Sequence, residues 1–273
     1  MRSHRHHHRT LRATAAVCAA LALAGPAPAA FAAAPAAPPR SAAAAAPDPF
    51  EGLTAAQIAD RAVIATRAAD SLRMTGRIVT DGQTLRVDFS VDSRGSCKGL
   101  IQVGGGTAEL RRLDGIVYMK GDSAFWRSSM ASQGVPEAQI APTVELVRGR
   151  WIKIAPGQAG SDDLSGVCDI GSLLTGLDRD RAARRGLTRG PDDEIAGTPV
   201  ATLVAHRPGA VTTTLSVAAE GTPYLLRIVR TGGSEPGSLA LSDFGRPVKV
   251  TAPPADQTLD LSRLDDTGTG TAA

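Results

Sequence analysis

The sequence predicts an α+β fold: a single large, curved antiparallel sheet of about 10–11 strands wrapped around helices. Five strand patterns occupy residues 74–120, and about five more occupy residues 194–244. Neighbouring strand patterns are joined by connections too short for crossovers, which favours antiparallel pairing. A sheet this large must curl. We therefore expect the helices to lie in its concave face.

A helix is predicted at the start of the folded part, from Thr54 to about Leu72. Thr54 is followed three residues later by Gln57, which fits a capping box. Apolar residues recur at helical spacing from Ile58 to Leu72. Most of them are alanines. This pattern indicates one apolar helix face that can approach a sheet closely.

The first strand series follows this helix, with short turn-rich connections, at residues 74–80, 84–92, 98–103, 107–113 and 116–120. The clearest alternation is in residues 84–92, where the apolar positions are Leu85, Val87, Phe89 and Val91. Such alternation is typical of a strand with one wet face. The run of three glycines at 104–106 is interpreted as a hairpin turn, because no Gly-Lys-Ser/Thr and no helix follows it.

Helical patterns fill the middle of the chain at 122–132, 137–147 and 162–177, with a short strand at 151–154. Pro142 weakens the second pattern, because an interior proline kinks or splits a helix. The second strand series then comprises residues 194–195, 199–206, 211–218, 224–231 and 238–244.

The first 32 residues have the pattern of a secretory signal peptide, with four arginines, an apolar run and an alanine-rich exit. The run is shorter than the roughly 20 residues that a membrane span needs. Residues 33–51 predict a disordered Ala/Pro-rich linker, 52–263 the folded domain, and 264–273 a disordered tail. We expect a secreted or extracytoplasmic cell-envelope protein.

Cys18 lies inside the apolar run, directly after Val17, so we favour a plain leader residue over a lipid anchor. The other two cysteines, Cys97 and Cys168, favour a disulfide in an exported protein. Two buried free thiols are the alternative. Loss of the leader arginines would change the net charge from +3 to near −1. No basis for binding nucleic acid then remains.

Candidate chemistry is sparse. His206 is the only histidine after the leader, and no serine lies in a G-x-S-x-G elbow. We therefore expect neither catalytic residues, nor a metal site, nor a cofactor. The acidic groups at 162–163 and 192–194 are interpreted as solvated loop or helix-cap residues, and the basic run at 179–185 as a solvated loop. Contact of that run with anionic head groups is the alternative.

Several short motifs follow one another along the chain: GIVYMKG at 115–121, GRWIK at 149–153, GTPYLLRIV at 221–229, SDFGRPVKV at 242–250 and APPAD at 252–256. Together with the first helix, they resemble the LppX/LprG family of actinobacterial cell-envelope lipoproteins over residues 52–263. The resemblance implies a LolA-like fold, in which an incompletely closed antiparallel barrel wraps helices. It also implies a non-catalytic carrier of acylated lipids or glycolipids.

On this hypothesis an apolar cavity lies between sheet and helices, because acyl chains need aliphatic walls and few polar groups. The candidate lining residues are Leu85, Val87, Phe89, Val91, Phe125, Trp126, Trp151, Leu215, Val217, Leu226 and Ile228. A monomer is expected, with a membrane surface or an envelope transporter as possible partner. The alternative is an envelope sensor or scaffold with a filled LolA-like core and no transported ligand.

Overall fold

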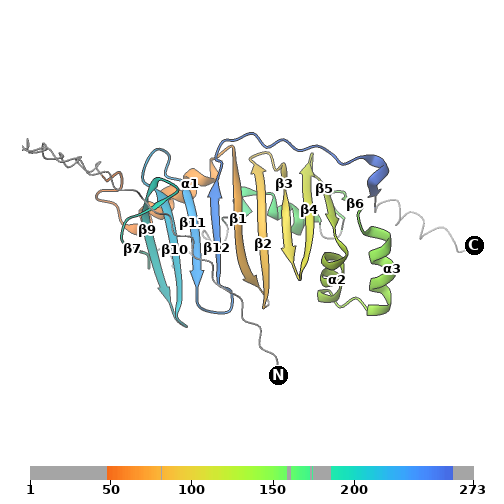
Figure 1. Ribbon diagram of the computed structural model, residues 1–273. Helices are drawn as coiled ribbons and strands as arrows, with labels where there is room; N and C mark the ends of the chain where they lie inside the picture. Colours follow the sequence, from red (N-terminus) through yellow and green to blue (C-terminus); the bar gives the residue numbers. More distant parts are fainter. Residues whose placement is uncertain (1–47, 81, 159–160, 173, 175–185, 261–273) are drawn as a thin grey trace, which may run out of the picture. The chain divides into compact units, whose positions relative to one another are not determined.

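One 13-stranded sheet organises the chain from Ser71 to Asp260 (Figure 1). The computed structural model describes residues 48–80, 82–158, 161–172, 174 and 186–260. The predicted signal peptide with Cys18, most of the predicted linker, the basic run at 179–185 and the predicted C-terminal tail lie outside these residues. The side chains at 162–163 also lie outside the description.

The elements before the second strand series follow each other closely. They are α1 (Ala55–Arg67), β1 (Ser71–Thr80), β2 (Gln83–Asp92), β3 (Cys97–Val103), β4 (Gly106–Leu113), β5 (Ile116–Gly121), α2 (Ser123–Ser132), α3 (Glu137–Val147), β6 (Trp151–Ile154) and α4 (Ser161–Val167). The second series comprises β7 (Thr188–Arg189), β8 (Asp193–Ile195), β9 (Thr198–Arg207), β10 (Val211–Ala218), β11 (Leu225–Thr231), β12 (Gly237–Ser242), the 3₁₀ helix η1 (Ala255–Gln257) and β13 (Thr258–Asp260).

The strand order is β13-β6-β5-β4-β3-β2-β1-β12-β11-β10-β9-β7, with β8 also paired to β9. Every pair is antiparallel except β13 and β6, which are parallel. The predicted large sheet is therefore confirmed. It is mixed, however, and has more strands than expected, because β7 and β13 were not predicted. β13 and β7 are the two ends of the order, so the sheet is open and not a closed barrel.

Helix α1 begins as predicted and ends earlier than predicted. The Thr54 hydroxyl accepts from the Gln57 backbone N–H at 3.3 Å, and the Gln57 side chain accepts from the Thr54 N–H at 2.9 Å, so the capping box is confirmed. The helix stops at Arg67, and the prediction that it reaches Leu72 is wrong. Leu72 instead pairs with Val91 in the sheet, because its spacing fits a strand as well as a helix.

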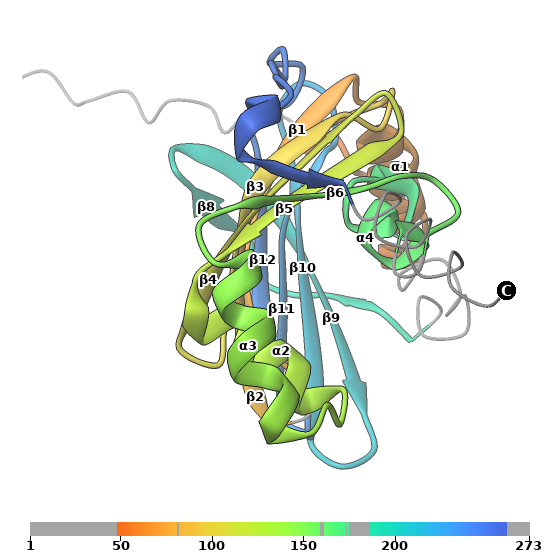
Figure 2. The same ribbon diagram turned by 90° about the vertical axis from the view of Figure 1, so that its right-hand side faces the viewer.

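Helices α1, α2 and α4 contact strands of the sheet, and α3 contacts α2. The apolar residues on one face of the sheet form one buried cluster with residues of α1 and α2, including Ile58, Phe125 and Phe89. We call this face of the sheet the inner face. Figure 2 shows α1 and α4 towards one end of the strands, and α2 and α3 towards the other. The predicted helix at 162–177 is interrupted: α4 ends at Val167, and after Cys168 and Asp169 residues 170–172 and 174 are helical again. Residues 173 and 175–177 lie outside the description. No described helix is long and apolar enough to cross a membrane.

Candidate functional site

One row of inward side chains crosses nine neighbouring strands, and each member is an aliphatic residue or glycine. Cross-strand pairing joins directly opposed residues in the order Leu203, Leu215, Ile228, Leu239, Gly76, Val87, Ile101, Ala108 and Gly121. We call this set the central row. Directly opposed Cβ atoms lie about 4.5–5.5 Å apart. The row is therefore a continuous apolar surface from β9 to β5.

The ends of the central row are buried, and its middle is half-buried. Leu203 and Ala108 are both fully buried, and Leu215 is 3% exposed. The half-buried members are Ile228, Leu239, Gly76, Val87 and Ile101, which we call the apolar strip. It covers five strands, or about 19 Å at a strand spacing of about 4.8 Å. Helix α1 contacts β10 and β11, and α2 contacts β3, β4 and β5, so helices flank the strip.

Burial changes along the strands on either side of the strip. Towards the disulfide, the next two rows contain Met74, Phe89, Leu110, Leu72 and Val91, each at most 5% exposed. In the opposite direction, Ile78, Leu85 and Val103 are again half-buried. The inner face therefore passes from a packed core to an incompletely covered apolar surface.

The predicted lining residues are distributed over both regions. Phe89, Val91, Leu215, Val217 and Phe125 belong to the packed core. Val87 and Ile228 belong to the strip, and Trp126 packs half-buried against the same cluster. Gly106 and Gly121 allow this end of α2 to approach, because a Cβ at either glycine would collide with Phe125. The indole Nε1 of Trp126 is buried and has no hydrogen-bond partner in the described part of the chain.

A β-bulge changes which leucine of β11 points inward. Ser216 of β10 pairs with Arg227, whereas Val217 pairs with Leu225, so Leu226 has no directly opposed partner. Leu225 is 1% exposed and joins the core, while Leu226 is half-buried and does not. The buried Thr66 hydroxyl of α1 accepts from the Leu225 backbone N–H at 2.9 Å, which fixes the helix to the bulge.

Trp151 is buried without joining the inner cluster. Its neighbours on β6, Ile152 and Ile154, belong to that cluster, so strand alternation places Trp151 on the opposite face, which we call the outer face. There the Arg111 guanidinium lies 4.4 Å from the indole centroid, and the Lys120 ammonium lies 5.9 Å from it. These are cation–π distances. The structure therefore separates Trp151 from Phe125 and Trp126.

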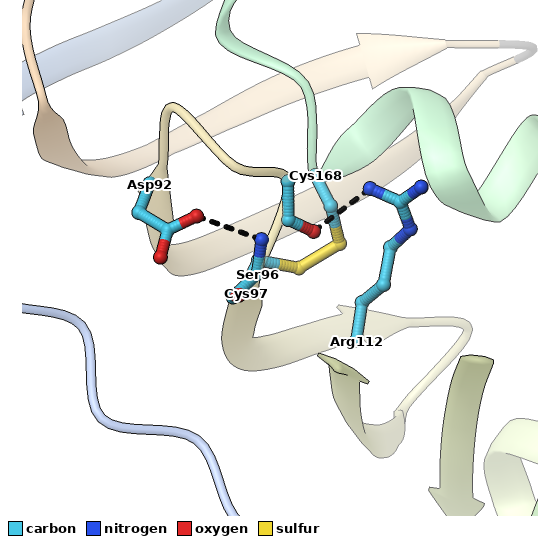
Figure 3. Close-up of a disulfide and its surroundings, with 6 residues drawn as sticks. Asp92, Ser96, Cys97, Arg112 and Cys168 are labelled. Atoms are coloured by element: carbon cyan, nitrogen blue, oxygen red, sulfur yellow. Dashed lines mark hydrogen bonds between the residues drawn. A yellow bond between two sulfur atoms is a disulfide. The ribbon is translucent and has the colours of Figure 1, made fainter. Parts of the chain in front are cut away.

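The predicted disulfide joins Cys97 to Cys168 across 71 residues, with the two Cα atoms 5.4 Å apart, and the free-thiol alternative is wrong. Figure 3 shows Arg112 beside it, where its Nη1 donates to the Gly95 carbonyl at 2.8 Å. The Ser172 hydroxyl donates to the Asp169 carboxylate at 2.6 Å and holds the pKa of that group below its ordinary value, with Arg112 adding attraction. The disulfide thus links β3 to the chain after α4 at the packed end of the inner face.

The outer face carries polar side chains, among them the histidine singled out in the sequence. His206 is exposed, and its Nδ1 lies 3.1 Å from the Thr212 hydroxyl. Among the described residues, no group of three His, Cys, Asp or Glu side chains could hold a metal ion. Hydrogen bonds from Arg73 at 2.7 and 2.8 Å lower the pKa of Asp88. Arg73 and Asp88 are partly exposed and form a surface ion pair.

Three members of the strip were missed by the sequence reasoning: Gly76, Ile101 and Leu239. Ile101 and Leu239 lie in strands that were predicted, at inward positions of the alternation. The signal that could have found them is the hairpin register, which places Ile101 opposite Val87 once the turn between β2 and β3 is known. Gly76 has no side chain, so hydrophobicity could not mark it.

No protein-family model and no curated protein matches the chain. Similar solved structures include LprF from Mycobacterium bovis, 16% identical over 74% of this chain and 97% of that one, with a TM-score of 0.49. The lipoprotein LppX from Mycobacterium tuberculosis is 16% identical over 72% of this chain and 97% of its own, with a TM-score of 0.46. A putative outer membrane lipoprotein-sorting protein domain from Vibrio parahaemolyticus is 13% identical over 71% and 94%, with a TM-score of 0.23. Likenesses of this size carry no ligand or activity over to this chain.

Proposed function

We propose that the protein is a non-catalytic, extracytoplasmic lipid-binding carrier. Its ligand would be an acylated lipid or glycolipid whose acyl chains lie along the apolar strip. The observation that carries the proposal is the incomplete burial of the strip, which lies next to the packed rows of the inner face. An unbroken apolar surface about 19 Å long, reckoned at about 4.8 Å per strand, suits an extended aliphatic guest.

The gain from covering this surface is large enough for specific binding. Each methylene removed from water contributes about 0.8 kcal/mol. About ten methylenes would then contribute about 8 kcal/mol before the cost of ordering the chain, which compares with a micromolar dissociation constant. The buried Trp126 N–H lies next to Gly121, at the β5 end of the central row, and has no hydrogen-bond partner among the described residues.

Two further features support an extracytoplasmic role without catalysis. The Cys97–Cys168 disulfide suits an oxidising compartment, as does the signal-peptide pattern of residues 1–32. The side chains around the strip are aliphatic, aromatic or glycine, which offers apolar contact and no acid–base chemistry. We expect a monomer that meets a membrane surface or an envelope transporter to exchange its lipid.

Native mass spectrometry of the secreted protein, purified without detergent, tests the proposal. We expect a fraction with the added mass of a lipid, and the same lipid in an organic extract. The delipidated protein should bind a fluorescent fatty-acyl probe that the natural lipid displaces. Protein that never carries lipid and never binds the probe would refute the function.

The packed rows favour a second candidate, an envelope sensor or scaffold with a filled core. Met74, Phe89 and Leu110 lie one row from the strip and are 5%, 0% and 0% exposed. If the strip serves only to complete such a core, the probe will not bind and lipid will not alter the melting temperature.

A further inference from the structure

Two arginines lie directly opposite each other on the outer face. Arg77 of β1 pairs with Arg86 of β2 in the antiparallel register, and both side chains are exposed. Directly opposed Cβ atoms are about 4.5–5.5 Å apart, and like charges at that position destabilise a sheet. A bound anion would relieve the repulsion between the two guanidinium groups.

Both arginines line one hollow of about 390 Å³, and none of the described residues that line it is acidic. Its other residues are Thr84, Gln102, Val103, Gly104, Gly105 and Thr107. Hydroxyl and amide groups accompany the two guanidinium groups there. The lining therefore combines two positive charges with neutral hydrogen-bonding groups.

Neither guanidinium has an ion pair or side-chain hydrogen bond among the described residues. The acid two residues along β2 on the same face is Asp88, and Arg73 binds both of its carboxylate oxygens. Other arginines of the sheet do have partners, such as Arg111 with Glu109 at 2.7 Å. Within the described part of the chain, Arg77 and Arg86 thus form a cationic pair without a counter-charge.

Guanidinium groups match phosphate oxygens with two parallel hydrogen bonds each, and Arg is favoured wherever a phosphate is recognised in this way. We propose that the hollow between Arg77 and Arg86 binds a phosphate-type anion. Resting on the proposed function, we identify that anion as the head-group phosphate of an acidic lipid. Val103 supports the link, because it lines the hollow and also packs against the inner cluster, two residues from Ile101 of the strip.

The test compares two double variants of equal charge. Arg77→Gln/Arg86→Gln removes the pair, whereas Arg94→Gln/Arg227→Gln removes two exposed arginines that do not line the hollow. Binding is measured for inorganic phosphate by calorimetry, and for phosphatidylglycerol and diacylglycerol with identical acyl chains by probe displacement. All measurements use phosphate-free buffer at one fixed salt concentration.

We expect the Arg77/Arg86 variant to bind phosphatidylglycerol at least tenfold more weakly, because two charge-assisted contacts are lost. Diacylglycerol binding should not change, and the control variant should match the wild type for both lipids. If no protein binds either lipid but phosphate binding still depends on the pair, the site takes a free phosphate and the lipid function fails. Equal phosphate and phosphatidylglycerol affinities in the Arg77/Arg86 variant and the wild type would overturn the anion site, as would equal losses in the control.

Discussion

Ile101→Asp is the sharpest perturbation of the apolar strip. Ile101 lies on the inner face between Val87 and Ala108, in the strand next to α2. A carboxylate at this position stays ionised and hydrated at neutral pH, because removing it from water is costly. An acyl chain lying on the strip would have to leave that part of the surface uncovered.

The size of the effect follows from the strand spacing. A hydrated carboxylate keeps the chain away from its own strand and from half the distance to each neighbour, which we take as about four methylenes. At about 0.8 kcal/mol for each methylene, the loss is about 3 kcal/mol. Since about 1.4 kcal/mol corresponds to a factor of ten, we expect at least a hundredfold weaker binding.

The adjacent residue provides the matched control. Leu100 is 44% exposed and pairs with Asp88 and Glu109, so it lies on the outer face of the same strand. Probe displacement should give a wild-type dissociation constant for Leu100→Asp. Circular dichroism and thermal unfolding of both variants confirm that they fold. Equal binding by the folded Ile101→Asp and Leu100→Asp variants would refute the assignment of the strip.

Three further predictions concern stability. Cys97→Ala opens the disulfide loop and should lower the unfolding free energy by about 4 kcal/mol in urea titrations. An unchanged urea midpoint would contradict this. Thr66→Val leaves the buried Leu225 N–H unpaired and should cost about 1–3 kcal/mol, whereas Thr66→Ser should retain most of the wild-type stability. Arg73 lowers the pKa of Asp88, so this pair stabilises the fold above the unfolded pKa of about 3.9 and is lost as pH falls through the folded pKa. Asp88→Asn should therefore give a shallower fall of melting temperature below that pH, and parallel curves would argue against it.

Local patterns predicted the parts of the fold that are determined locally. The Thr54 capping box depends on residues three apart, and it forms as expected. The alternation of residues 84–92 is the clearest in the chain, and its apolar positions do lie on the inner face. The glycines at 104 and 105 have φ of 58° and 78°, which suits the tight turn between β3 and β4.

Features that depend on distant residues could not be predicted in the same way. β13 has only three residues and pairs in parallel with β6, more than 100 positions earlier in the sequence. The inward position of Leu225 depends on a bulge, and a shift of one residue reverses the faces of a strand. Trp151 suggested an apolar lining by its type, but β6 places it on the outer face beneath Arg111.

The expectation of a bound lipid came from the family resemblance, and the candidate lining residues stay a prediction. Two of them, Val87 and Ile228, lie in the strip. The strip itself depends on register across five strands and on which positions the helices leave uncovered. Gly76 is its middle member, and its backbone lies so close to β12 that a Cβ would collide with Ser238 and Leu239.

Three contacts that stabilise the fold lie outside the strip. The disulfide joins β3 to the chain after α4, and Thr66 joins α1 to β11, both at the packed end of the inner face. Gly106 of β4 and Gly121 of β5 let Phe125 pack against these strands, which lie next to the β3 end of the strip. A guest can therefore cover or leave the strip while these contacts persist, because none of them involves its five residues. On the proposed function, a lipid would enter and leave without disrupting the disulfide, the Thr66–Leu225 hydrogen bond or the Phe125 packing.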